Sequence, residues 1–159
     1  MCAALAAVVV AMTSPLAQVP ALETLPVHGQ VSLVTDGTTN ALLQLGPQGV
    51  LIVDTLSEPA ADRLLEAVRA KAGSRPIRYV VNTHADPAFI GGNAQVAVAG
   101  SQLVAGNFAG QVGQRAVDGA VPQAFVVAHE NVLTRMSAPT GGRPAAPFAA
   151  WPTDTFFQA

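Results

Sequence analysis

The chain has 159 residues, of which 50% are hydrophobic and 11% are charged, and its formal net charge at pH 7 is −2. This length suits a single domain with a core of its own. The near-neutral charge provides no basic surface for a nucleic acid. The only cysteine, Cys2, excludes an internal disulfide and a multi-cysteine zinc site.

The N-terminal stretch from Met1 to Met12 is almost wholly apolar. A membrane span needs about 20 such residues, so this run has the length of a signal-peptide core instead. We expect residues 1–17 to be a signal peptide, 18–26 a linker and 27–159 the domain, in an exported protein that is periplasmic or secreted. Because no Lys or Arg precedes the run, an Ala-rich N-terminal helix is the alternative.

The next part of the chain predicts strands followed by one helix. Alternating or continuous apolar residues predict strands over 27–34, 40–45 and 50–53, separated by Gly-containing turns. Ser57 can cap a helix that ends at Gly73. Its apolar positions follow the spacing of one buried face: Ala61, Leu64, Leu65, Val68 and Ala72. A further strand is predicted over 76–81.

The second half of the chain is predicted in less detail. We expect a short helix over 91–99, strands over 102–105 and 124–128, a helix from His129 to Met136, and a strand beginning within 153–157. Residues 106–123 fit either a lid or insertion loop or a flexible helix. The Pro and Gly content predicts a loop over 137–152.

Polar residues follow the strand over 76–81, in a segment that reads Val-Val-Asn-Thr-His-Ala-Asp-Pro-Ala-Phe-Ile-Gly-Gly-Asn from 80 to 93. Strand ends that deliver polar side chains to a loop are where α/β proteins place their chemistry. The segment resembles the metal-binding motif of the metallo-β-lactamase superfamily, Asn-Thr-His-x-His-x-Asp-His-x-Gly-Gly-Asn. His84 falls on the first histidine, and the closing Gly-Gly-Asn is retained as Gly91, Gly92 and Asn93.

Three ligand positions of that motif are changed. Asp86, Ala88 and Phe89 stand where the family has its second histidine, its aspartate and its third histidine. His84 and Asp86 are therefore the candidate metal ligands, with zinc as the metal that the resemblance implies. Two ligands are fewer than the three or four of known zinc sites. The alternative is a hydrogen-bonded loop histidine at 84 and a turn-forming aspartate at 86.

The resemblance also implies a fold and an activity. The fold class is α/β, half of an αββα sandwich with a mixed sheet and flanking helices, matched over about residues 27–157. Such a half sandwich exposes an apolar sheet face, which favours self-association. Asp54 matches a Val-Asp-Thr of the family and looks structural, as do Gly91, Gly92 and Asn93 around the site. The family's remaining ligands come from its second half, and no histidine follows His129 here.

Three hypotheses about function remain open. The first is a hydrolase-like protein, related to enzymes that cleave esters, thioesters or amides with metal-bound hydroxide, in which metal binding is impaired or absent. The second is a non-catalytic pseudoenzyme that binds a small ligand or a partner chain. The third is a metal site rebuilt from His84, Asp86 and donors of another subunit. None of the three involves a nucleic acid or a transmembrane segment.

Overall fold

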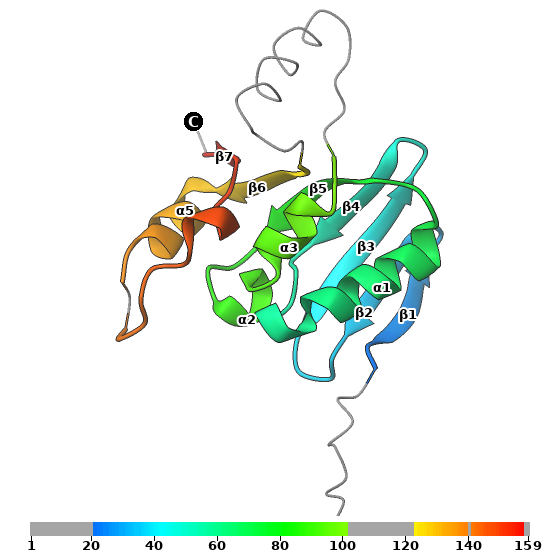
Figure 1. Cartoon of the computed structure of the whole chain (residues 1–159), viewed down its shortest axis with the longest axis horizontal. Coiled ribbons are helices and arrows are strands. Elements are labelled where there is room, and N and C mark those ends of the chain that lie inside the picture. The colour runs from blue at the N-terminus through cyan, green and yellow to red at the C-terminus, as the bar shows by residue number, and fades with distance from the viewer. Residues whose placement is uncertain (1–20, 102–122, 140, 158–159) are drawn as a thin grey trace, which may run out of the picture.

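The computed structural model describes residues 21–101, 123–139 and 141–157. Their strands form one mixed sheet of seven strands in chain order, from β1 to β7 (Figure 1). The strands are β1 (Glu23–His28), β2 (Val31–Thr35), β3 (Asn40–Gly46), β4 (Gly49–Val53), β5 (Ile77–Asn82), β6 (Phe125–His129) and β7 (Asp154–Phe156). Neighbours from β1 to β4 pair antiparallel, and neighbours from β4 to β7 pair parallel.

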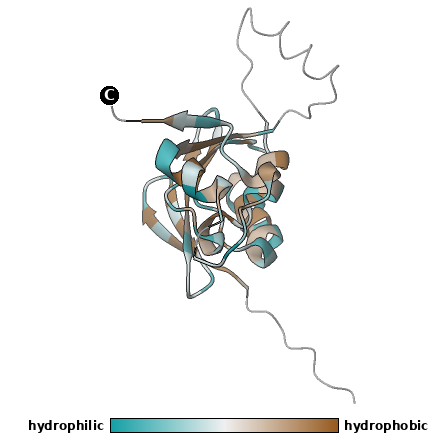
Figure 2. Cartoon of the chain, turned by 90° about the vertical axis from the view of Figure 1, so that its left-hand side faces the viewer, coloured by the Kyte–Doolittle hydropathy of each residue, from teal (hydrophilic) through white to brown (hydrophobic). Residues whose placement is uncertain are grey.

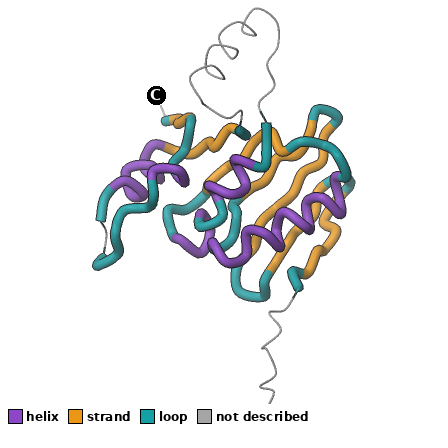
Figure 3. The backbone as a smooth tube through the Cα atoms, viewed as in Figure 1, coloured by secondary structure: helices purple, strands orange, loops and turns teal. Residues whose placement is uncertain are grey.

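The helices lie on one face of this sheet (Figures 2 and 3). Each parallel step moves in the same direction along the sheet, so right-handed crossovers bring their helices to the same face. The helices are η1 (Glu58–Ala60), α1 (Ala61–Ala72), α2 (Pro87–Ile90), α3 (Asn93–Val98), α5 (Glu130–Ser137) and η3 (Phe148–Ala150). This arrangement confirms the predicted fold class of a mixed sheet with flanking helices, half of an αββα sandwich.

The core lies between the sheet and these helices. Alternate strand residues point into it, including Leu43, Ile52 and Val80, which are at most 1% exposed. Helix α1 contributes the apolar face that the sequence predicted, with Leu64 fully buried. Fully burying a side chain of this kind contributes about 1.5–3 kcal/mol.

Two predicted boundaries at the N-terminal side are wrong. The single strand expected over 27–34 is two antiparallel strands, β1 and β2, with a turn at Gly29, whose φ is +53°. The expected linker therefore overlaps β1 from Glu23 onward. Pro26 suggested a linker, but a proline is tolerated in β1 because that strand lies at the edge of the sheet.

The helical segments begin at other residues than the sequence suggested. Ser57 makes no side-chain cap hydrogen bond to η1. The helix expected over 91–99 begins at Asn93, after the separate short helix α2. The expected signal peptide, the strand over 102–105 and nearly all of the 106–123 segment lie outside the described residues. No helix in the described part of the chain is long and apolar enough to cross a bilayer.

Candidate functional site

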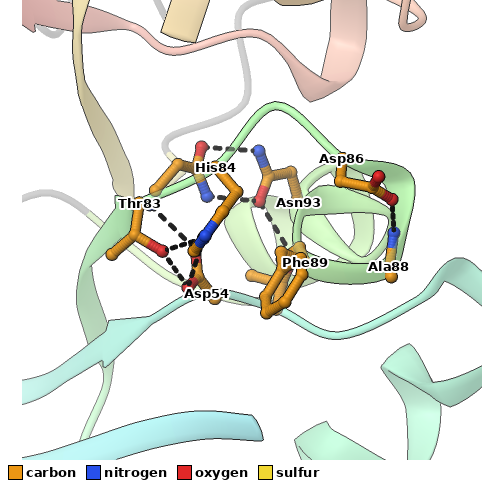
Figure 4. A network of polar contacts seen from close by, with 9 residues as sticks. Asp54, Thr83, His84, Asp86, Ala88, Phe89 and Asn93 are labelled. Atoms are coloured by element: carbon orange, nitrogen blue, oxygen red, sulfur yellow. Dashed lines mark hydrogen bonds and ion pairs between the residues drawn. The ribbon is translucent and has the colours of Figure 1, made fainter. Parts of the chain in front are cut away.

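The candidate site lies where two parallel strands end. Asp54 directly follows β4, and Thr83 and His84 directly follow β5. The backbone N–H of Asp54 donates to the carbonyl of Val81, 2.9 Å away, so the two strand ends remain paired. Figure 4 shows their side chains together with those of the loop that continues into α2 and α3.

Asp54, Thr83 and His84 form a chain of hydrogen bonds. Asp54 accepts from the backbone N–H of Thr83 at 2.9 Å and from its hydroxyl, and that hydroxyl lies 2.6 Å from Nδ1 of His84 (Figure 4). Because the Thr83 hydrogen is donated to the carboxylate, its oxygen can only accept from Nδ1–H of His84. Nε2 is then the ring nitrogen with a free lone pair. The His84 side chain is 57% exposed, whereas that of Asp54 is 8% exposed.

Asp86 has two partners of its own. It caps α2 by accepting the N–H of Ala88 at 3.1 Å, and its other oxygen accepts from the Arg143 guanidinium at 2.9 Å. The hydrogen bond from Arg143 and the N–H of Ala88 hold the pKa of the Asp86 carboxyl below its ordinary value. Pro87 follows at the first helical position, where its missing N–H costs nothing.

Phe89 packs directly on the candidate histidine. Its ring is stacked on that of His84, with the centroids 4.3 Å apart and the planes 20° from parallel. Its backbone carbonyl accepts the N–H of Thr55 at 2.7 Å, which fixes α2 against the loop after β4. The aromatic residue at a ligand position of the family motif is thus a packing partner of His84.

Gly91 and Gly92 are explained by close approach. A Cβ on Gly91 would lie 2.4 Å from the backbone nitrogen of Glu58, and one on Gly92 would lie 2.5 Å from the carbonyl oxygen of Thr55. Their φ angles, −58° and −81°, are accessible to any residue. Space, and not a special backbone conformation, requires glycine at both positions.

Asn93 is the centre of a buried hydrogen-bond network. Its amide nitrogen donates to Asn82 Oδ1 and to the carbonyl of Ala150, both at 2.8 Å. Its amide oxygen accepts from Asn82 Nδ2 at 3.0 Å and from the Thr55 hydroxyl at 2.9 Å. The side chain is fully buried and all of its polar groups are paired, so it joins β5, the loop after β4 and η3.

A cavity of about 1100 Å³ opens beside this loop. One wall is the loop and α2, including His84 and Asp86, and the other is made by α5 and residues 143–147. Most of its lining is apolar, and its charged residues are Glu58, Asp86, Arg135 and Arg143. Its mostly apolar lining with a few polar groups is typical of a site for a small organic molecule, and its volume lies slightly above the roughly 300–1,000 Å³ of such sites.

The described residues around this loop supply too few donors for a zinc site. Among the described residues, no group of three or more His, Cys, Asp or Glu side chains could hold a metal ion. His84 offers one nitrogen, while both oxygens of Asp86 already have partners and Phe89 has no donor atom. His129 does not join them, because it caps α5 by accepting the N–H of Asn131 at 3.1 Å.

Comparison with known proteins finds a family similarity over part of the chain. Residues 34–105 match the family model described as the metallo-beta-lactamase superfamily. This segment runs from the end of β2 to beyond α3, and it includes β5 and the loop that carries the motif. This part of the chain is similar to the metallo-β-lactamase superfamily, as the motif indicated. No curated protein matches the sequence.

Solved structures share the fold at low sequence identity. MEM-A1, a subclass B3 metallo-β-lactamase from a soil metagenome library, aligns with TM-score 0.58 at 18% identity, over 86% of this chain and 46% of that one. SMB-1, bound to 2-mercaptoethanesulfonate, aligns with TM-score 0.55 at 18% identity, over 86% and 46%. A Cronobacter sakazakii metallo-β-lactamase described by a HARLDQ motif gives 0.55 at 20%, over 84% and 47%. The chain spans less than half the length of these structures.

Sequence reasoning missed several residues of the site. Arg143 contacts Asp86 across 57 positions of the chain, and Phe89 was recognised only as a changed ligand. The signal for Arg143 was weak, although it is the only charged residue from 137 to 152. Asn82 and Thr83 belong to the Asn-Thr-His of the motif, but nothing in their types revealed their partners.

Proposed function

We propose that this chain is a binding domain with the metallo-β-lactamase fold and no zinc-dependent hydrolysis, and that its ligand occupies the cavity beside the 83–89 loop. One observation carries the proposal: the changed motif positions have partners inside the protein. Asp86 is bonded to Ala88 and Arg143, and Phe89 is stacked on His84. A metal ion at this loop would have to displace those contacts.

The lining of the cavity supports the proposal that the site binds a small molecule. Apolar residues such as Ile90, Val132 and Met136 line it. His84 adds a hydrogen-bond acceptor, because its Nδ1–H is engaged by Thr83 and Nε2 is free. The chemistry of this lining suits a mainly apolar small molecule whose O–H or N–H donates to His84.

Filling the cavity tests this proposal. The probe is a panel of small neutral aromatic alcohols and amides, and binding is followed by ligand-observed NMR. Ala94→Phe places a ring in the cavity, whereas Val98→Phe changes an exposed position of the same helix. We expect compounds that bind the unmodified chain and the Val98→Phe variant but not the Ala94→Phe variant. The proposal is wrong if no compound binds, or if Ala94→Phe binds the same compounds equally well.

A second candidate is a hydrolase whose metal site is completed by another subunit. The hydrogen bond from His84 to Thr83 favours it, because metal-binding histidines usually donate their other N–H to an oxygen partner. This candidate predicts that zinc increases the oligomer size and that His84→Ala abolishes the increase. An oligomer size that does not respond to zinc would exclude it.

A further inference from the structure

One face of the sheet is apolar and is covered by no described element. Cross-strand register places six aliphatic residues in a single row across β1 to β6: Leu25, Leu33, Leu42, Val53, Val81 and Val127. A second row beside it consists of Val31, Gln44, Leu51, Tyr79 and Phe125. We call these eleven residues the open sheet face.

Strand alternation places the open sheet face opposite the helices. The residues between its members point the other way and are buried in the core, as Leu43, Ile52, Val80 and Val126 are. The members themselves stay partly or largely accessible, with Leu25 and Tyr79 each 40% exposed. The rings of Tyr79 and Phe125 stack on each other across neighbouring strands, with centroids 5.8 Å apart.

We propose that a second copy of this chain covers the open sheet face, sheet against sheet. A two-fold dimer brings the same patch of both copies together, so the patch must be complementary to itself. The open sheet face meets this condition because none of its eleven residues is charged and only Gln44 carries a polar amide. No like charges are brought together when it meets itself.

The size of the face also suits a dimer. Six strands spaced about 4.8 Å apart, and two residue rows about 6.7 Å apart, cover on the order of 400 Å² of flat area. Side-chain relief adds accessible area, so two copies would bury close to the roughly 1,000 Å² in total that a specific interface needs. Aligned packing of two such sheets gives the layer order helix, sheet, sheet, helix. This dimer does not depend on the proposed ligand.

The test is the mass of the full chain in solution, measured by sedimentation velocity and light scattering. We expect twice the 16.2 kDa of one chain. Val81→Glu places a carboxylate at the centre of the row, and we expect it to raise the dimer dissociation constant at least tenfold, because burying an unpaired charge is costly. Val98→Glu makes the same exchange at a 58% exposed position on the helix side and should stay dimeric.

Tyr79→Lys provides a second variant in case Val81→Glu does not fold, which circular dichroism would reveal. Tyr79 is 40% exposed, so its replacement disturbs the core little. We expect the folded variant to be more dissociated than the unmodified chain. The proposal is overturned by a monomeric unmodified chain, by aggregates of no fixed size, or by a dimer that Tyr79→Lys and Val81→Glu leave unchanged.

Discussion

Phe89 and Asp86 have partners within the protein at positions where the similar family motif has metal ligands. The ring of Phe89 contributes stacking against His84, and the carboxylate of Asp86 contributes a helix cap and an ion pair. Neither role needs the geometry of a metal ion. The Gly91, Gly92 and Asn93 of the motif have roles in the fold itself, through close packing and buried hydrogen bonds.

Asn93 provides a prediction at the residue scale. Asn93→Ala leaves the Asn82 amide without its buried partner and removes the bonds to Thr55 and Ala150. We expect a loss of about 2–4 kcal/mol in the free energy of unfolding, since each unsatisfied buried polar group costs about 1–3 kcal/mol. Urea denaturation measures it, with Gln95→Ala on the exposed side of the same helix as control. Equal stability of the two variants would contradict the network.

Asp86 provides a prediction about pH. Its folded-state pKa is lowered, first by the hydrogen bond from Arg143, so its contribution to stability is present above the unfolded pKa of about 3.9. That contribution is lost as pH falls through the lower folded-state pKa. The Asp86 and Arg143 side chains are 43% and 61% exposed, so solvent screening limits the effect to less than about 1 kcal/mol.

Thermal unfolding between pH 6 and pH 2 measures this contribution. We expect Asp86→Asn to be less stable than the unmodified chain at pH 6, and the difference to vanish as the pH falls towards 2. If the stability difference between Asp86→Asn and the unmodified chain stays constant across this pH range, the Asp86 carboxylate does not stabilise the fold through its charge.

At the scale of elements, α3 can approach the loop after β4 only because Gly92 has no side chain. A Cβ there would meet the Thr55 carbonyl oxygen at 2.5 Å. We expect Gly92→Ala to lower the free energy of unfolding by about 1–3 kcal/mol, the usual cost of overpacking. Gly46→Ala is the control, because its nearest contact is an ordinary 3.5 Å. Equal melting temperatures of the two variants would show that a Cβ at position 92 can be accommodated without cost.

The elements also show which local patterns predict structure. Helix α1 was predicted because its apolar residues follow one face. Helix α5 was predicted from His129 to Met136, and each of its two ends lies one residue later, at Glu130 and Ser137. Strand β1 was hidden by Pro26, whose position at a sheet edge is a property of the whole sheet. Helix α2 has only four residues, too few for any periodicity to appear.

For the whole molecule, the motif predicted the fold better than it predicted the site. The Gly-Gly-Asn frame indicated the superfamily, and residues 34–105 match it. The cavity could not be predicted, because its second wall comes from α5 and residues 143–147, far along the chain from the loop. The contact between Arg143 and Asp86 depends on the same long-range packing.

The central proposal is that the 83–89 loop does not hold zinc. The measurement is zinc per chain, by elemental analysis of the purified protein after exposure to zinc and dialysis. Beside it we would place His84→Ala and a triple variant, Asp86→His with Ala88→Asp and Phe89→His, which restores the family motif. Zinc sites use three or four protein ligands, so we predict no bound zinc in the unmodified chain and retention in the triple variant. About one zinc per unmodified chain, lost in His84→Ala, would contradict the account.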